Sequence, residues 1–252
     1  MTKRTILITG AGSGFGKGSA IELASRGHHV IAATETQAQA DALAAEHPEL
    51  TTLKLDVTSS DDIAQVPALK LDILINNAGM GVMAPMASVP MAKVRAIFDV
   101  NVFGMVELSQ TVIPGMKERG WGRIINMSSV AGFFAAPLGS PYAMTKHAVE
   151  AFTKSLRAEM APYGIDVTKV NPGPYETGFN DRMINGITNF TAAGDAAATE
   201  TAGTLRDAVL PNQLDPMEIV MTLANLAEAD ETPMETILPE GILESLQALL
   251  DA

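Results

Sequence analysis

Short apolar runs alternate along the chain with longer segments whose apolar positions recur at helical spacing. The helical segments are expected at 17–26, 37–46, 90–120 with an interruption at Pro114, 140–163, from 215 onward and at 243–250. The runs are rich in β-branched residues, as in parallel strands buried on both faces, and occupy 5–9, 29–33, 51–57, 71–76, 122–127, 166–170 and 236–238. Such alternation indicates βαβ units. We therefore predict an α/β fold, a doubly wound parallel sheet with helices on both faces, in a single domain spanning residues 1–252.

The segment from 174 to 214 has no strand pattern and is rich in alanine, threonine and glycine. A structureless loop of this length is unusual in a compact domain. In a parallel α/β sheet the ligand crevice lies at the carboxyl ends of the strands. We therefore expect short helices in this segment, forming a mobile substrate flap over that crevice.

The charge balance of the chain limits its partners. With 17 basic and 29 acidic residues the net charge is −12, which repels phosphate backbones and anionic membranes. No apolar run reaches the length of a membrane helix, and the apolar run near the N-terminus is too short for a signal peptide. We predict no nucleic acid partner and no membrane partner.

Two further compositional features bear on compartment and assembly. The chain has no cysteine, which excludes disulfides and thiolate chemistry and agrees with a cytoplasmic location. The mean hydropathy of +0.17 indicates buried sheet and subunit interfaces. We therefore expect a homo-oligomer, either a dimer or a tetramer.

A glycine-rich turn follows the first predicted strand and opens the first predicted helix, with the sequence Gly10-Ala11-Gly12-Ser13-Gly14-Phe15-Gly16. Glycines let the backbone approach a pyrophosphate closely, while free N–H groups and the helix dipole stabilise its charge. Glu35 follows the second strand, where a carboxylate can accept hydrogen bonds from the adenosine ribose and repel a 2′-phosphate. The pattern predicts a Rossmann-type dinucleotide site with a preference for NAD, although a solvated loop carboxylate is the alternative for Glu35.

Tyr142 and Lys146 stand four residues apart in a predicted helix, so their side chains project from one face. A nearby ammonium is expected to lower the pKa of a tyrosine from about 10. Ser129 ends the strand upstream, where its hydroxyl can donate to a carbonyl oxygen on which charge develops. Alone, the pair fits a half-buried tyrosine beside a solvated lysine, but the glycine turn favours carbonyl chemistry. The four histidines have no metal-site spacing, so no metal is predicted.

Taken together and in this order, these motifs resemble the short-chain dehydrogenase/reductase family over roughly residues 4 to 178. The matching stretches are Thr9-Gly10-x-x-x-Gly14-x-Gly16, Asn76-Asn77-Ala78-Gly79 and Tyr142-x-x-x-Lys146. The resemblance implies a catalytic tetrad: Tyr142 as general acid/base, Ser129 as carbonyl donor, Lys146 as tuner of Tyr142 and ligand of the nicotinamide ribose, and Asn101 as anchor of a proton-relay water. It also implies that Asp56 and Val57 border the adenine and that Thr177 holds the carboxamide. The residues expected to bind the cofactor are Gly10, Gly12, Ser13, Gly14, Phe15, Gly16, Thr34, Glu35, Asp56, Val57, Asn77, Ala78, Gly79, Tyr142, Lys146, Pro172, Gly173 and Thr177.

Departures from the family pattern bear on the cofactor. Thr34 occupies the position that usually carries the NAD-selecting aspartate. Discrimination between NAD and NADP therefore depends on the neighbouring Glu35. The basic residue that NADP-binding members tend to carry is missing at both Ser13 and Glu35. NAD is the predicted cofactor, and a reductase that prefers NADPH is the main alternative. A halohydrin dehalogenase would have lost the cofactor turn and replaced Lys146 with arginine, and a cofactor sensor would be expected to have lost Tyr142 or Lys146.

Large apolar residues are expected to approach the crevice from several segments. One charged residue of the flap, Arg182, argues against an apolar pocket. We expect its side chain to be solvated, because Asp181 adjoins it. Burial of apolar substrate surface is favourable by roughly 25 cal/mol per Å². The predicted substrate is therefore an uncharged, hydrophobic ketone or secondary alcohol, in contact with Met83, Phe133, Phe134, Phe179, Met183, Ile184 and Phe190.

Overall fold

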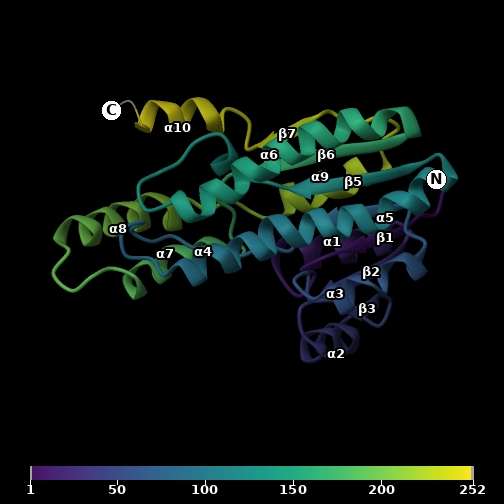
Figure 1. Ribbon diagram of the computed structural model, residues 1–252, viewed down its shortest axis with the longest axis horizontal. Helices are drawn as coiled ribbons and strands as arrows, with labels where there is room; N and C mark the ends of the chain where they lie inside the picture. The colour runs from purple at the N-terminus through teal and green to yellow at the C-terminus, as the bar shows by residue number, and fades with distance from the viewer. Residues whose placement is uncertain (1, 251–252) are drawn as a thin grey trace.

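A seven-stranded parallel sheet in the order β3-β2-β1-β4-β5-β6-β7 lies at the centre of the structure, a computed structural model that describes residues 2–250 (Figure 1). Every neighbouring pair is parallel. The strand order reverses between β1 and β4, which places a ligand crevice at their carboxyl ends. The predicted fold is confirmed, with strands β1 (Thr5–Ile8), β2 (His29–Thr34), β3 (Thr51–Lys54), β4 (Ile73–Asn76), β5 (Gly122–Met127), β6 (Ile165–Pro172) and β7 (Glu235–Leu238).

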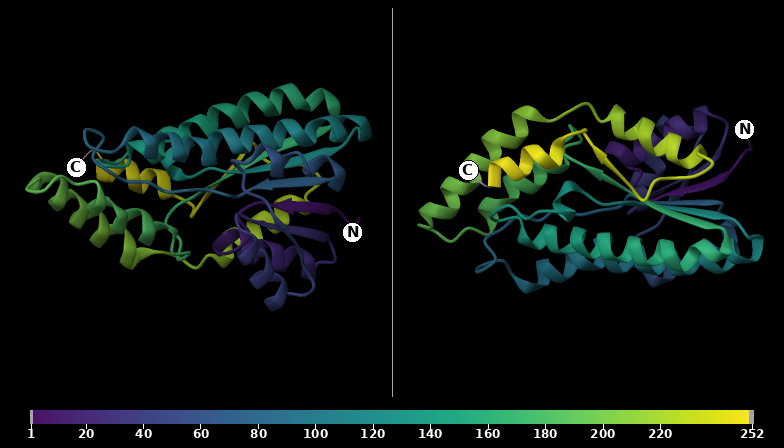
Figure 2. Two further views of the ribbon diagram at one scale, coloured as in Figure 1. Left: turned by 60° about the horizontal axis from the view of Figure 1, so that its bottom comes forward. Right: turned by 90° about the horizontal axis from the view of Figure 1, so that it is seen from above.

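Helices cover both faces of the sheet (Figure 2). On one face, α1 (Gly14–Ser25), α2 (Gln37–Glu46) and α9 (Met217–Glu228) bury leucines and isoleucines in one cluster with residues of β1, β2, β4 and β5. On the other face, α5 (Met105–Arg119) and α6 (Ser140–Met160) pack against alternate residues of the same strands. Because both faces are covered, the five inner strands β1, β2, β4, β5 and β6 consist almost entirely of buried residues, which explains their continuous apolar runs. The edge strands β3 and β7 are only partly buried.

The helical segment before β5 differs from the prediction. It consists of α4 (Met91–Phe98), the π-helix η2 (Asp99–Gly104) and α5, and α5 continues through Pro114. The predicted interruption at Pro114 is wrong because Pro114 and Gln110 are exposed, so water can reach the Gln110 carbonyl that the proline leaves unpaired. By length and composition Met91–Arg119 would suffice to cross a membrane. Its buried residues Leu108, Val112 and Met116 pack against the sheet instead, as in a core helix.

The connection after β3 runs along the crevice. The strand ends at Lys54 rather than at the predicted Val57, because the backbone N–H of Asp56 turns to donate to Asp62 Oδ2 at 2.7 Å. The short helix α3 (Ser60–Ile63) follows and is capped by the Ser59 side chain, which accepts from Asp62 N. The remaining short elements outside the flap are η1 (Val66–Leu69), η3 (Val130–Gly132), η4 (Ala161–Tyr163) and α10 (Ile242–Leu250).

The predicted flap forms a helical excursion beyond the carboxyl ends of the strands (Figures 1 and 2). Its two ends are joined by a β-bridge between Tyr175 and Leu214, where Glu176 N donates to Leu214 O at 2.8 Å. The whole segment therefore leaves the domain and returns to it at one point. It contains α7 (Phe179–Asn185), η5 (Gly186–Asn189), α8 (Ala196–Val209) and η6 (Leu210–Asn212).

Candidate active site

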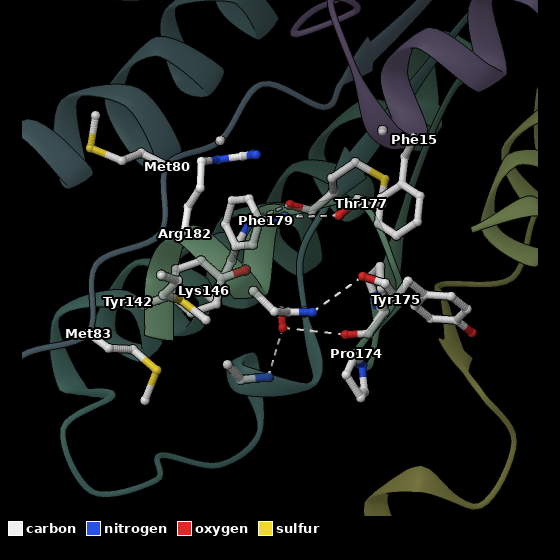
Figure 3. A pocket seen from close by; sticks show the side chains of 18 of the residues that line it. Phe15, Met80, Met83, Tyr142, Lys146, Pro174, Tyr175, Thr177, Phe179 and Arg182 are labelled. Carbon is white, nitrogen blue, oxygen red and sulfur yellow. Dashed lines mark hydrogen bonds between the residues drawn. The ribbon is translucent and has the colours of Figure 1, made fainter. Parts of the chain in front are cut away.

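A cavity of about 800 Å³ follows the carboxyl ends of the strands, under the flap. One end is lined by Glu35 and Gln39, and the other end reaches Leu205 and Val209 of α8. Lys146 lies between these ends (Figure 3). The cavity is lined by every residue predicted to bind the cofactor except Gly16.

The glycine turn between β1 and α1 is held in shape by close packing. Gly16 is buried behind the turn, where an added Cβ would lie 2.4 Å from Asn77 Nδ2 and 2.5 Å from the Gly10 carbonyl oxygen. Gly14 has a φ of +53°, which favours glycine. The first turn of α1 contains no acidic residue, and the first N–H groups of a helix have no partner within it. The turn can therefore bind an anion, although Gly16 contributes by packing rather than by contact.

Asn77 ties the turn to the end of β4. Its Nδ2 donates to the carbonyl oxygens of Thr9 at 2.9 Å and Gly10 at 3.2 Å. The backbone N–H groups of Asn77 and Ala78 both donate to Thr9 Oγ1 at 3.0 Å. These bonds fix the two strand ends on either side of the crevice.

The adenosine end of the cavity is acidic. Thr34 is buried and donates to the Thr36 carbonyl oxygen at 3.1 Å, whereas Glu35 is exposed beside it. Asp56 accepts hydrogen bonds from the N–H and hydroxyl of Thr58 at 2.9 and 2.8 Å. The described residues that line this end include no lysine or arginine.

Tyr142 and Lys146 lie on the face of α6 that points into the cavity (Figure 3). Both are buried, with 9% and 5% of their surfaces exposed. The Lys146 ammonium donates to the Met127 carbonyl oxygen at 2.8 Å and lies 5.6 Å from the centre of the Tyr142 ring. Ser129 caps η3, accepts from Ala131 N at 3.1 Å and also lines the cavity. The structure thus brings together three of the four residues of the implied tetrad around one space.

Burial controls the protonation of the tyrosine and the lysine. It raises the pKa of the Tyr142 phenol above its usual value, and the neighbouring Ser129 hydroxyl offsets only part of this effect. The expectation of a lowered pKa for Tyr142 is therefore wrong for this structure, because burial of the phenol raises it. Burial also lowers the pKa of Lys146 to about 8, although the Glu150 carboxylate favours the charged form. At neutral pH the tyrosine is a phenol, able to donate a proton, and the lysine is an ammonium.

Asn101 lies in the π-helix η2, and its side chain does not line the cavity. Its Oδ1 accepts from Met80 N at 2.7 Å, and its Nδ2 donates to Met80 O at 2.9 Å and to Thr145 Oγ1 at 3.0 Å. Both amide hydrogens are thus engaged. The side chain holds the Met80 backbone beside the cavity. The implied anchoring of a relay water by Asn101 stays a prediction.

Sequence reasoning missed a polar network beneath the catalytic residues, centred on Glu150. The Glu150 carboxylate accepts from Ser128 Oγ, from Asn171 Nδ2 at 2.6 Å and from Lys169 Nζ at 3.0 Å. Asn171 Nδ2 also donates to the Ser129 carbonyl oxygen at 3.1 Å. The network connects α6, β6 and the two serines that follow β5, below the cavity. Glu150 stands one helical turn after Lys146, and this spacing was the available signal.

The substrate end of the cavity is mainly apolar. Of the residues expected there, the cavity is lined by Met83, Phe134, Phe179, Met183 and Ile184. Phe133 and Phe190 do not line it. Phe133 has 39% of its surface exposed, and Phe190, at the end of η5 in the flap, packs against the cluster that contains Val89 and Val94. Leu205, Val209 and Leu246 complete the wall and were not predicted.

Arg182 lies exposed at the edge of this cavity. This exposure agrees with the expectation that Arg182 is solvated, and the adjoining Asp181 Oδ2 accepts from Gln213 Nε2 at 3.1 Å. Among residues 2–246, whose side chains the structure describes, the Arg182 guanidinium has no hydrogen bond or ion pair. The same part of the chain contains no group of three His, Cys, Asp or Glu residues that could hold a metal ion.

The comparisons with known proteins agree with this geometry. A sequence model of the family described as short chain dehydrogenase matches residues 4–186. Human retinol dehydrogenase 8 is 32% identical over 250 residues, which cover 92% of this chain and 80% of that protein.

Two solved structures have similar folds. A short-chain dehydrogenase from Sphingobium yanoikuyae in complex with NADPH has a TM-score of 0.78 and 29% identity, covering 98% of this chain and 92% of the other. A bulky-bulky ketone specific alcohol dehydrogenase from Comamonas testosteroni has a TM-score of 0.74 and 27% identity, covering 98% and 91%. The chain therefore belongs to the short-chain dehydrogenase/reductase family of NAD(P)-binding oxidoreductases.

Proposed function

We propose that this protein is an NAD(H)-dependent oxidoreductase that interconverts a hydrophobic secondary alcohol and its ketone. One observation carries the proposal: Tyr142, Lys146 and Ser129 line the middle of one cavity, between a glycine turn and an apolar wall. The glycine turn would hold a dinucleotide so that Tyr142, Lys146 and Ser129 lie at its reactive end, and the apolar wall would hold the substrate beside them.

In the reduction direction, Tyr142 donates its phenolic proton to the carbonyl oxygen of the substrate. Ser129 donates a hydrogen bond to the same oxygen as negative charge develops on it. Lys146, charged at neutral pH, stabilises the phenolate that the transfer leaves and hydrogen-bonds the nicotinamide ribose. When bound, the nicotinamide supplies the hydride to the carbonyl carbon, or accepts it from the alcohol in the reverse direction.

The acidic adenosine end supports NAD over NADP. Glu35 and Asp56 line this end, and a 2′-phosphate there would meet two carboxylates and no cation among the described lining residues. An NADPH-preferring carbonyl reductase is the second candidate, since the similar Sphingobium yanoikuyae structure contains NADPH.

The apolar wall supports a bulky, uncharged substrate. Met83, Phe134, Leu205 and Val209 would desolvate an apolar group favourably, whereas a buried carboxylate or phosphate would be strongly disfavoured there. Two similar proteins are named for compounds of this kind, retinol in one case and bulky-bulky ketones in the other.

A substrate panel tests the proposal. Apolar ketones of increasing size, keto acids and sugar phosphates are compared with NADH, and bulky apolar ketones are expected to give the highest kcat/KM. Higher kcat/KM on the anionic compounds would contradict the proposed substrate, and no turnover of any ketone with NADH or NADPH would contradict the proposed activity.

We also propose a homo-oligomer. Met91 and Phe103, with 52% and 59% of their surfaces exposed, flank a hollow on α4 and η2 that is lined by Val94 and Phe98 as well. A second copy would remove this apolar surface from water. Sizing chromatography that shows only monomer would contradict this. The cytoplasmic location stays a prediction from composition.

A further inference from the structure

We propose that Arg182 of the flap binds the pyrophosphate of the bound dinucleotide, so that the cofactor itself holds the flap closed. The inference rests on the proposed cofactor binding and adds a residue that neither the glycine turn nor the tetrad includes.

The position of Arg182 supports this assignment. An added Cβ at Gly178 would lie 3.0 Å from Arg182 Nη1, so the guanidinium folds back over the start of α7. Gly178 follows Thr177, and an added Cβ at Gly14 would lie 3.2 Å from the Thr177 Cβ. The flap therefore brings this cation next to the segment that contacts the glycine turn. In Figure 3 the guanidinium points into the space between Met80 and Thr177, away from Met83.

The flap keeps the charge of Arg182 free for a ligand. Gln213 accepts from Asn180 Nδ2 at 2.9 Å and donates to Asp181 Oδ2 at 3.1 Å. This pair of bonds holds the neighbouring carboxylate at the base of the flap. Arg182 is left without a salt bridge in the part of the chain that the structure describes.

The charge distribution along the cavity points to the pyrophosphate as the ligand. The described lining residues contain two cations, Lys146 and Arg182, and the buried Lys146 ammonium already donates to the Met127 carbonyl oxygen. A pyrophosphate brings two negative charges into a chain of net charge −12. The N–H groups of the turn can bind one side of it, and a guanidinium can bind the other with two parallel hydrogen bonds.

The base of the flap is fixed to the domain, so the flap can close on the cofactor as one unit. The flap leaves and rejoins the domain at the bridge between Tyr175 and Leu214. The Tyr175 hydroxyl donates to Glu218 Oε2 of α9 at 2.5 Å, and its ring packs against Phe15 at 5.7 Å. This fixed base lets α7 and α8 respond together to a contact made by Arg182. The cofactor is then expected to bind before the substrate.

Affinity measurements test the inference. Arg182→Gln and Arg182→Lys are titrated with NADH and NADPH by fluorescence, and with ADP-ribose by displacement of NADH. Arg206→Gln is the control, because Arg206 is an exposed flap arginine that does not line the cavity. We expect roughly tenfold weaker binding of all three ligands in Arg182→Gln, a smaller loss in Arg182→Lys and no change in the control. The Kd of Arg182→Gln should also depend less on salt than that of the wild type.

Limited proteolysis gives a readout of closure. Trypsin can cleave after Arg206 on α8. ADP-ribose should slow this cleavage in the wild type. In Arg182→Gln it should slow the cleavage much less, when both proteins are saturated with ADP-ribose to the same extent. Equal protection in both proteins would overturn the coupling of the flap to the cofactor.

Other outcomes separate this inference from competing ones. An unchanged Kd for all three ligands in Arg182→Gln overturns it, as does a loss confined to NADPH, which would assign the arginine to the 2′-phosphate. An unchanged Kd with a raised KM for anionic substrates would assign it to the substrate and also overturns it. If the wild type binds none of the ligands, the proposed cofactor binding fails first.

Discussion

The ammonium nitrogen of Lys146 lies 5.6 Å from the ring centre of Tyr142, and both side chains are buried on one face of α6. Burial disfavours the charged form of each group, so it raises the pKa of the tyrosine and lowers that of the lysine. The pair therefore starts as phenol and ammonium, and proton transfer from Tyr142 becomes favourable only when the substrate oxygen accumulates charge.

Replacing Tyr142 by phenylalanine is expected to remove the proton donor and keep the ring. A general acid contributes roughly 10²- to 10⁴-fold in rate, so kcat for ketone reduction should fall by that factor while the Kd for NADH stays near normal. Tyr163→Phe is the control, because Tyr163 is exposed at the end of the same helical segment. Retention of most of the turnover in Tyr142→Phe would remove the tyrosine from the mechanism.

The pH dependence of ketone reduction is expected to follow Lys146. Its pKa of about 8 means that the ammonium is present below pH 8 and is lost as the pH rises through 8. Tyr142 stays protonated over this range because its pKa is raised. The value of kcat/KM should therefore be level below pH 8 and fall above it.

Glu150 provides a check on that assignment. Its carboxylate raises the pKa of Lys146, so Glu150→Gln should move the break in the pH profile to lower pH. A break that stays at the same pH in this variant would assign the titration to another group.

Reversing the charge at Glu35 is expected to change cofactor preference. The wild type should bind NADH more tightly than NADPH, because the exposed carboxylate of Glu35 and the half-buried carboxylate of Asp56 line the adenosine end. Glu35→Arg should narrow or reverse the ratio of the two Kd values, by roughly tenfold for a charge-assisted contact to phosphate. Fluorescence titration with both reduced cofactors measures it, and equal affinities in the wild type would contradict the electrostatic argument.

The fold could be predicted from the sequence because the signals that mark helices and strands are local. The helix at Gln37–Glu46 and the strand at Gly122–Met127 have the predicted bounds, since glycine, caps and apolar periodicity mark their ends. The prediction of an interruption at Pro114 was wrong because a proline is tolerated where water can reach the carbonyl it leaves unpaired. That exposure depends on how α5 packs, which the sequence pattern does not give. The end of β3 at Lys54 depends on the hydrogen bond from Asp56 to Asp62, a contact that periodicity does not encode.

In the candidate site too, the features that depend on local spacing were predicted and those that depend on contacts between distant segments were not. Tyr142, Lys146 and the glycine turn were recognisable because their spacing within one element carries the chemistry. The commitment of Asn101 to Met80, the network around Glu150 and the hydrogen bond from Gln213 to Asp181 each arise between distant segments. The pKa of Tyr142 depends on burial, which the Tyr-x-x-x-Lys spacing does not give.

Narrowing the far end of the cavity is expected to select against bulky substrates. Ala208 of α8 lines the cavity and is exposed, so a tryptophan there adds bulk without overpacking the core. For Ala208→Trp we expect kcat/KM to fall at least tenfold for the bulkiest ketones and to change little for short ones, with an unchanged Kd for NADH. Ala197→Trp is the control, since Ala197 is exposed on the same helix outside the cavity. An equal fall for short and bulky ketones in Ala208→Trp, or the same selectivity in the control, would show that the substrate does not extend along α8.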